Sequence, residues 1–425
     1  MPERAVERFL SRKHRWLAPA HGLVVLIGIV CGCASSWAGD WPQILGPHRS
    51  GQAEGESLPA RLNSQSSKAV WQREVGSGFA GVSVAGDTLA LFHRRGEQLI
   101  AEALDAGSGK PRWTREFPTQ YVSSLSPDDG PRAAPVIAGD DVYLFGPDGS
   151  LRSLDLATGR ERWVRQTQTD FSPPEGYFGA GSSPLVEGEL LLLNVGGRQG
   201  SAVVAFDRKS GGTRWKAFDD AASYSSPVGV TVDGVRHAIF VTRLNVVSLD
   251  PATGQVRFRF PFGKRGPTVN GANPVVVGST LLVTASYGIG AQARTFSATN
   301  STLIWESDEA LSSQYVTPVE RGGYLYGIDG RQDGPPARLR CVDLKTGKVR
   351  WTAENFGVAA LIMSGDKLLA MKVDGELTMC KANPDQFESL GSVRLFESET
   401  VQALPALAGG RLYVRSEKLL RCFQL

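Results

Sequence analysis

The sequence predicts an all-β fold, an eight-bladed β-propeller with four-stranded antiparallel blades. A phrase recurs as LDAGSGKPRW at 104–113, LDLATGRERW at 154–163 and VDLKTGKVRW at 342–351. The full period of about 47 residues lies in the range typical of propellers and solenoids. Between the phrases are short β-branched and aromatic runs broken by turn residues, with no sustained helical period. Four strands per period correspond to one propeller blade.

Residues 1–38 have the order of a secretory signal peptide. Basic residues between Arg4 and Arg15 precede the apolar run GLVVLIGIVCGC at 22–33, and small residues follow as far as Ala38. The apolar run is shorter than the roughly 20 residues that span a bilayer. We expect cleavage after Ala38 and a periplasmic or secreted protein. Lipidation at Cys33 is the alternative, and it is the only membrane attachment we expect.

The rest of the chain divides into two parts. Residues 39–69 are expected to form an extended tether, because their Gly, Pro and Ser content argues against a separate domain. The propeller is expected over 70–425. Proline is tolerated in sheets only at strand starts and edges, so the first strand of each blade should be innermost, with its free edge on the central channel. The prolines at these strand starts are Pro135, Pro184, Pro227, Pro274, Pro318 and Pro405.

The two ends of the chain are expected to complete one blade together. The last repeat ends in LLRCFQL with no fourth strand, while VWQREV at 70–75 reads as a fourth strand with no repeat before it. We therefore predict that the N-terminal strand closes the ring on the C-terminal blade. Eight units begin near Ala80, Ala133, Ser182, Ser225, Ala272, Val316, Val358 and Val401.

We call the recurring phrase the blade motif and predict that its residues have structural rather than catalytic or ligand-binding roles. Its Asp can accept hydrogen bonds from turn amides, and its Gly supplies the positive φ that closes a short hairpin. Its Trp begins the outer strand and should cover apolar surface of the next blade. The full copies are Asp105, Gly109 and Trp113; Asp155, Gly159 and Trp163; Asp207, Gly211 and Trp215; and Asp343, Gly347 and Trp351. Weaker copies have Asp250, Gly254 and Phe258, and Ser297, Ser301 and Trp305.

The three cysteines after the signal fall at one position of the repeat. Small residues stand two places before each Asp position, among them Thr295, Cys341, Cys380 and Cys422. We expect a tight slot between blades that holds buried thiols. A disulfide or a metal site is the alternative.

The phrases LDLATGRERW and VDLKTGKVRW resemble the tryptophan-docking repeats of the quinoprotein alcohol dehydrogenase-like superfamily, the eight-bladed PQQ-repeat propellers. The resemblance covers about residues 70–425. It implies either a PQQ-dependent dehydrogenase or a non-catalytic member of the BamB type. The dehydrogenases typically have adjacent cysteines beside the cofactor, and quinohaemoprotein members have a CxxCH motif. This sequence has neither after the signal and is closer in length to the non-catalytic members.

Other chemistries find little support. The net charge of +3 gives no general attraction to nucleic acid, and we expect no nucleic-acid partner. GSGFAG at 76–81 leads into a strand rather than the helix that would hold a pyrophosphate. His48, His93 and His237 are far apart in the sequence and lack the spacing of zinc ligands or a catalytic triad. No metal site is predicted.

A candidate ligand-binding funnel comes from the topology. In a blade, the loops between second and third strands share one face, the crossing face, with the connections between blades. The blade motif lies on the opposite, hairpin face. Aromatic and basic residues on the crossing face would suit an anionic or extended-peptide ligand; alternatively they plug the hub and keep its rim soluble. The funnel residues are Arg95, Tyr121, Tyr177, Phe178, Ser183, Arg198, Tyr224, Ser226, Arg243, Asn273, Tyr315 and Arg331.

The leading functional hypothesis is a non-catalytic, monomeric scaffold that binds proteins or peptides outside the cytoplasm. No cofactor is predicted. The alternative is a PQQ-dependent oxidoreductase that uses calcium and holds the quinone's carboxylates with funnel arginines. Carbohydrate binding on the aromatic face is a third hypothesis.

Overall fold

The structure is a computed structural model that describes residues 39–174 and 176–425. The expected signal peptide at 1–38, with Cys33, lies outside the described residues. Within the two described ranges, no helix has both the length and the apolar character needed to cross a membrane.

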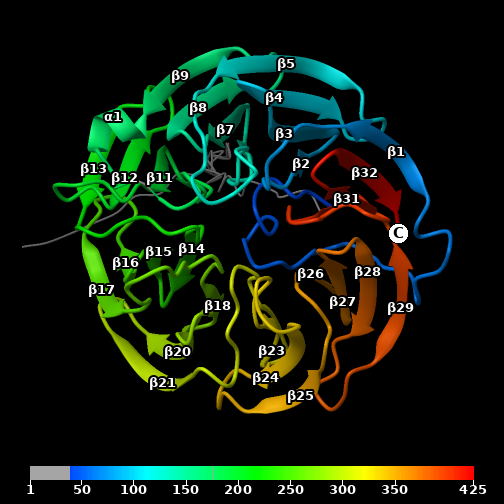
Figure 1. Ribbon diagram of the computed structural model, residues 1–425. Coiled ribbons are helices and arrows are strands. Elements are labelled where there is room, and N and C mark those ends of the chain that lie inside the picture. Colours follow the sequence, from blue (N-terminus) through cyan, green and yellow to red (C-terminus); the bar gives the residue numbers. More distant parts are fainter. Residues whose placement is uncertain (1–38, 175) are drawn as a thin grey trace, which may run out of the picture. The chain divides into compact units, whose positions relative to one another are not determined.

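Eight antiparallel sheets of four strands form a ring, which confirms the predicted propeller (Figure 1). From the channel outward, the first four blades are β2 (Ser83–Ala85), β3 (Thr88–Arg95), β4 (Gln98–Asp105) and β5 (Pro111–Pro118); β6 (Val136–Ala138), β7 (Asp141–Phe145), β8 (Ser150–Asp155) and β9 (Glu161–Gln166); β10 (Leu185–Glu187), β11 (Leu190–Asn194), β12 (Val203–Asp207) and β13 (Thr213–Ala217); and β14 (Val228–Val232), β15 (Val235–Val241), β16 (Asn245–Leu249) and β17 (Val256–Pro261). The other four are β18 (Val275–Val277), β19 (Thr280–Ala285), β20 (Gly290–Phe296) and β21 (Ser301–Ser307); β22 (Val319–Arg321), β23 (Tyr324–Asp329), β24 (Arg338–Asp343) and β25 (Val349–Ala353); β26 (Ala359–Ser364), β27 (Lys367–Lys372), β28 (Glu376–Lys381) and β29 (Ser389–Arg394); and β30 (Ala406–Ala408), β31 (Arg411–Arg415), β32 (Leu419–Gln424) and β1 (Ala69–Glu74). A short helix, α1 (Thr167–Phe171), lies in the crossing between β9 and β10.

The ring closes as predicted. Strand β1 pairs antiparallel with β32, with Trp71 opposite Cys422 and Glu74 opposite Leu419. The first strand of each blade contacts the first strand of a neighbour, as β2 does with β6 and β30, so these strands are innermost. The apolar core lies between blades. Tyr143 and Phe145 of one blade, for example, pack in one cluster with Leu191 and Phe206 of the next.

Residues 39–69 differ from the expected tether, because much of this segment packs into the ring. Trp41 is 2% exposed and pairs with Val84 of β2, and Gln52 forms a parallel bridge to Met363 of β26. Leu58 and Leu62 are also buried. In Figure 1 the dark-blue chain runs across the centre of the ring. The physical reason is that the inner strands have free edges that need hydrogen-bond partners. We call residues 41–53 the channel segment.

Candidate functional site

The blade motif joins each blade to the next on the hairpin face. Asp155 Oδ1 accepts the Thr158 N–H at 2.9 Å, and Gly159 has a φ of 69°. The indole N–H of Trp113, from the preceding blade, donates to the Leu156 carbonyl at 2.8 Å. A Cβ on Gly159 would lie 2.6 Å from the Trp113 ring, so only glycine fits beneath it. The hydrogen-bonding groups and the ring of the motif are therefore used in contacts within the propeller, which leaves none of them for a ligand.

The same contact recurs around the ring. Trp indole groups donate to a carbonyl in the next blade's turn in five further cases: Trp71 to Ala106, Trp163 to Arg208, Trp215 to Pro251, Trp305 to Leu344 and Trp351 to Asn383. Trp71 shows that the ring-closing strand uses the same contact. The fold thus accounts for all six tryptophans at this position of the repeat.

One alignment in the weakest copy was wrong. Ala293, not Thr295, lies opposite Trp305, because the β20–β21 hairpin extends two residues further than in other blades. Ala293 is fully buried, whereas Thr295 is exposed.

The cysteines lie in the expected slot: Cys341, Cys380 and Cys422 are free and buried. Burial raises the pKa of the Cys380 thiol to about 12 and those of the other two to about 11.

The small polar residues at the strand entrances form a belt between blades rather than an open mouth. The Ser183 N–H donates to Ser226 Oγ, the Ser226 N–H to Asn273 Oδ1, and the Asn273 N–H to Thr317 Oγ1, at 2.7–2.9 Å. All four residues are buried. Arg49 of the channel segment donates to the carbonyls of Ser183, Pro184 and Pro227. Burial lowers the pKa of this guanidinium to about 9.

Four of the predicted funnel residues gather on the crossing face between the β10–β13 and β14–β17 blades. The Phe178 ring lies 6.4 Å from Tyr177 and 5.7 Å from Tyr224, measured between centroids. Tyr224 Oη accepts the Phe178 N–H at 2.7 Å, and burial raises the pKa of Tyr224 to about 12. Tyr177 Oη and Arg243 Nη2 both donate to the Gly266 carbonyl, at 3.2 and 2.7 Å.

A cavity of 210 Å³ opens at this cluster, and we call it the aromatic-basic pocket. Tyr177, Tyr224, Arg243, Asn194 and Asn270 are among its lining residues. Three buried polar atoms on these side chains have no hydrogen-bond partner among the described residues, namely Asn194 Oδ1, Asn270 Oδ1 and Arg243 Nη1. Asn194 is 2% exposed and Asn270 fully buried. The side chains around the pocket therefore include two acceptor atoms and one cationic donor atom that are buried and have no partner within the described residues.

The remaining funnel residues do not join this pocket. Arg198 is exposed. Tyr121 lies against Gly179, and its carbonyl accepts a hydrogen bond from Arg94. Tyr315 and Arg331 belong to a separate group, where Tyr315 Oη donates to Gln332 and Arg331 lies 5.2 Å over the Tyr287 ring. A single funnel around the whole mouth is therefore not formed. Sequence patterns placed these residues on one face but gave no distances across it.

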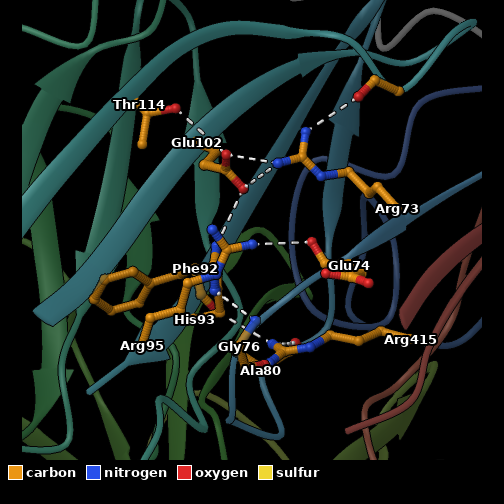
Figure 2. Close-up of polar contacts among 11 residues, drawn as sticks. Arg73, Glu74, Gly76, Ala80, Phe92, His93, Arg95, Glu102, Thr114 and Arg415 are labelled. Carbon is orange, nitrogen blue, oxygen red and sulfur yellow. Dashed lines mark hydrogen bonds and ion pairs between the residues drawn. The ribbon is translucent and has the colours of Figure 1, made fainter. Parts of the chain in front are cut away.

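Sequence reasoning missed a buried polar cluster where the ring closes (Figure 2). Arg73 of β1 forms an ion pair at 2.7 Å with Glu102 of β4, whose other oxygen lies 3.1 Å from His93 Nε2 of β3. His93 Nδ1 accepts the Gly76 N–H at 2.9 Å, which leaves Nε2 as the donor to Glu102. The only available signal was a titratable residue, His93 or Glu102, next to the apolar run of each of two strands.

In this cluster, burial and the neighbouring charged groups shift the pKa values of His93 and Glu102 in opposite directions. Burial lowers the pKa of His93 below 6.5, and the hydrogen bond to Glu102 only partly offsets it. For Glu102 burial acts to raise the pKa, but the His93 hydrogen bond and the Arg73 charge outweigh it and the pKa is lowered. Arg415 of β31 donates to the carbonyls of Gly76, Ala80 and Phe92. Arg95, also in Figure 2, reaches the Glu74 carbonyl at 3.1 Å. The cluster stabilises the junction of the two chain ends.

The comparison with protein families agrees with this architecture. The family described as outer membrane protein assembly factor BamB matches residues 55–218 and 177–353. The chain belongs to the BamB family. The expected membership of the PQQ-repeat superfamily is thereby confirmed.

Relatives of this BamB-family propeller include both assembly factors and enzymes. The outer membrane protein assembly factor BamB of Yersinia pestis is 21% identical over 63% of this chain and 72% of its own length. The quinohemoprotein alcohol dehydrogenase ADH IIB of Pseudomonas putida is 33% identical over 29% of this chain, but that match spans only 19% of the dehydrogenase. The crystal structure of BamB from Moraxella catarrhalis has a TM-score of 0.61 at 16% identity, covering 84% of this chain and 97% of that one. At that identity the likeness shows the fold alone.

Proposed function

We propose that this propeller is a non-catalytic binding or assembly scaffold outside the cytoplasm, which holds protein or peptide partners on its crossing face. The observation that carries the proposal is the aromatic-basic pocket with its three unpaired polar atoms. Buried polar atoms are normally hydrogen-bonded, so unpaired ones around a cavity favour a ligand. The relatives named as outer membrane protein assembly factors support a protein as that ligand.

A peptide amide offers the groups that the pocket lacks. Arg243 Nη1 would donate to the amide carbonyl, and the side-chain oxygens of Asn194 and Asn270 would accept its N–H groups. Tyr177 and Tyr224 supply ring surface at a small cost in side-chain entropy. On the crossing before β6, Val122 and Leu125 are 69% and 60% exposed and offer further apolar surface on the crossing face. The expected anchor is an Asn or Gln side chain, or a backbone amide.

The alternative, a PQQ-dependent oxidoreductase, has the similarity to quinohemoprotein dehydrogenases in its favour. The pocket residues that the structure describes do not by themselves supply a PQQ–calcium site. Calcium takes oxygen ligands that usually include carboxylates, and among the described lining residues, which leave out position 175, there is neither Asp nor Glu. Cys341, Cys380 and Cys422 lie on the third strands of three different blades, which is incompatible with a disulfide between adjacent cysteines.

Site-specific photo-crosslinking in the native host tests the proposal. A photoreactive residue in place of Tyr177 should give a discrete adduct with a partner protein, whereas one at Val256, exposed on the outer strand β17, should give none. Adding Arg243→Ala should weaken binding of the partner about tenfold, as expected for loss of a charged hydrogen bond. Saturable binding of PQQ with calcium, together with dye-linked oxidation of alcohols or sugars, would overturn the proposal. Saturable binding to a glycan array would favour carbohydrate instead.

A further inference from the structure

The channel segment binds the inner strands as an added β-strand does. On one side of the channel, the N–H and carbonyl of Trp41 pair with the carbonyl and N–H of Val84, both at 2.8 Å. On the other side, the Met363 N–H donates to the Gly51 carbonyl at 2.8 Å and its carbonyl accepts the Ala53 N–H at 2.7 Å. The free edges of the innermost strands are thus competent to hold extended polypeptide.

The repeat identifies the equivalent edge positions elsewhere in the ring. Val84 pairs with Leu89 one step before the β2–β3 hairpin, and Met363 pairs with Leu368 in the same place. Thr231 opposite Arg236 and Val276 opposite Leu281 occupy that position in β14 and β18. By this equivalence their N–H and carbonyl groups face the channel. Within the described ranges, no backbone group bonds to them from across the channel.

A cavity of 550 Å³ lies beside these two edges on the hairpin side of the channel. It is bounded by β14, β18 and the end of β22, and by His48–Gln52 of the channel segment. Exposed strand edges are normally covered, twisted away or charged. Here the chain covers the edges of β2 and β26 with its own residues and leaves those of β14 and β18 open to the cavity.

The charges around the cavity favour an acidic occupant. Arg321, at the end of β22, is exposed and forms no ion pair within the described residues. His48 also lines the cavity, but its Nε2 lies 3.7 Å from Glu54 Oε2, so it adds no unpaired charge. Arg236 is held by Glu187 at 2.5 Å, and the carboxylate of Glu320 accepts the Gly323 N–H at 2.7 Å. That hydrogen bond leaves the negative charge of Glu320 in place, but Arg49 and Arg321 are both lining residues without an ion pair within the described ranges, so unpaired cationic groups outnumber unpaired carboxylates.

We propose that this cavity is a second binding site, in which an extended peptide strand with acidic flanking residues adds to the inner edge of β18. Main-chain hydrogen bonds to Val276 would supply affinity, and Arg321 would select the acidic flank. The site lies on the opposite face from the aromatic-basic pocket and does not depend on the function proposed for that pocket.

Hydrogen exchange of the purified protein gives the first test. Without peptide, the amides of Val84 and Met363 should exchange slowly, while those of Thr231 and Val276 exchange quickly, because only the former are hydrogen-bonded across the channel. Adding a capped hexapeptide of sequence EVTVTE should slow exchange at Val276. Slow exchange at Val276 in the free protein, or no change at saturating peptide, contradicts the proposal.

Fluorescence anisotropy with the labelled EVTVTE peptide gives the second test. Val276→Pro removes the channel-facing N–H at an edge position where proline is tolerated, and should weaken binding about three- to tenfold. Arg321→Glu should reverse the preference, so that a KVTVTK peptide binds better than EVTVTE. Lys345→Glu, the same charge change on an exposed turn of the hairpin face, should leave affinity unchanged. Equal affinity for both peptides in the unaltered protein, or loss of binding in Tyr224→Ala, would place the peptide elsewhere.

Discussion

At the residue scale, the blade motif shows why a repeat so specific for the fold says little about ligands. Every polar group that makes the motif recognisable is used within the ring. Asp155 orders its own turn, and Trp113 uses both its ring and its N–H on the next blade. The residues that bear on binding, such as Asn194, Asn270 and Arg243, belong to no repeated phrase. Their significance depends on polar atoms left unpaired beside a cavity.

Two glycine substitutions separate the roles of backbone and tryptophan. Gly159 and Gly139 have similar φ values of 69° and 64°, but a Cβ would meet Trp113 at 2.6 Å in the first and open space in the second. Gly139→Ala should cost about 1 kcal/mol of unfolding free energy from the left-handed backbone alone. Gly159→Ala should cost about 1–3 kcal/mol more, because the methyl displaces the indole. Urea unfolding of the two variants measures the difference. Equal losses would mean that the tryptophan contact contributes nothing.

The ring-closure cluster predicts acid sensitivity. The folded-state pKa of His93 is lowered below 6.5, so the unfolded chain binds this proton more tightly and the stabilisation is complete only above pH 6.5. Stability should therefore fall as pH drops below 6.5, by at most about 1.4 kcal/mol per pH unit for this group. The lowered pKa of Glu102 adds a loss in the same direction at lower pH.

Chemical denaturation between pH 8 and pH 5 tests this expectation. His93→Gln should be less stable than the unaltered protein at pH 8, because a buried hydrogen bond is lost, but its stability should fall less steeply below pH 6.5. His48→Gln is the matched control, since the His48 side chain is 60% exposed, and it should leave the slope unchanged. An unaltered slope in His93→Gln would show that other groups cause the acid loss.

At the element scale, the incomplete repeats at the two chain ends were enough to predict the pairing of β1 with β32, because a blade without its outer strand leaves an edge that needs a partner. The course of residues 39–69 was not predictable in the same way. Gly, Pro and Ser report only that a segment forms neither helix nor regular strand. Trp41 and Leu58 were visible as apolar residues, but their burial depends on the inner-strand edges, which exist only after the ring has formed.

Truncation tests the contribution of the closing strand. A chain lacking residues 39–76 loses β1, the Trp71 contact with Ala106 and the Arg73–Glu102 ion pair. We expect it to lose cooperative thermal unfolding. Appending residues 69–76 after Leu425 through a short turn should restore a cooperative transition, because Ala69 lies opposite Phe423, but at a lower temperature than in the full chain, because the buried channel segment is still missing. Unchanged stability of the truncated chain would contradict ring closure by this strand.

At the scale of the whole molecule, the propeller has a different candidate binding site on each of its two faces. The crossing face has the aromatic-basic pocket, and the hairpin side of the channel has the cavity beside β14 and β18. Four of the predicted funnel residues meet at this pocket, whereas Ser183, Ser226 and Asn273 form the belt between blades, Arg198 is exposed, and Tyr315 and Arg331 belong to a separate group. A ring of eight blades spreads equivalent positions around a circumference, so residues that share a face need not share a site.

The sequence by itself determined the fold, the number of blades, the innermost strand and the closure of the ring. These follow from local signals, such as strand periodicity, turn glycines and a tryptophan at fixed spacing. Each signal is weak by itself, but its repetition along the chain makes the prediction specific. Only the tertiary structure decided where the channel segment runs, which polar atoms stay unpaired and which inner edges stay open. Those features arise from groups far apart in the chain that meet across the ring, and no local pattern of residues encodes such a meeting.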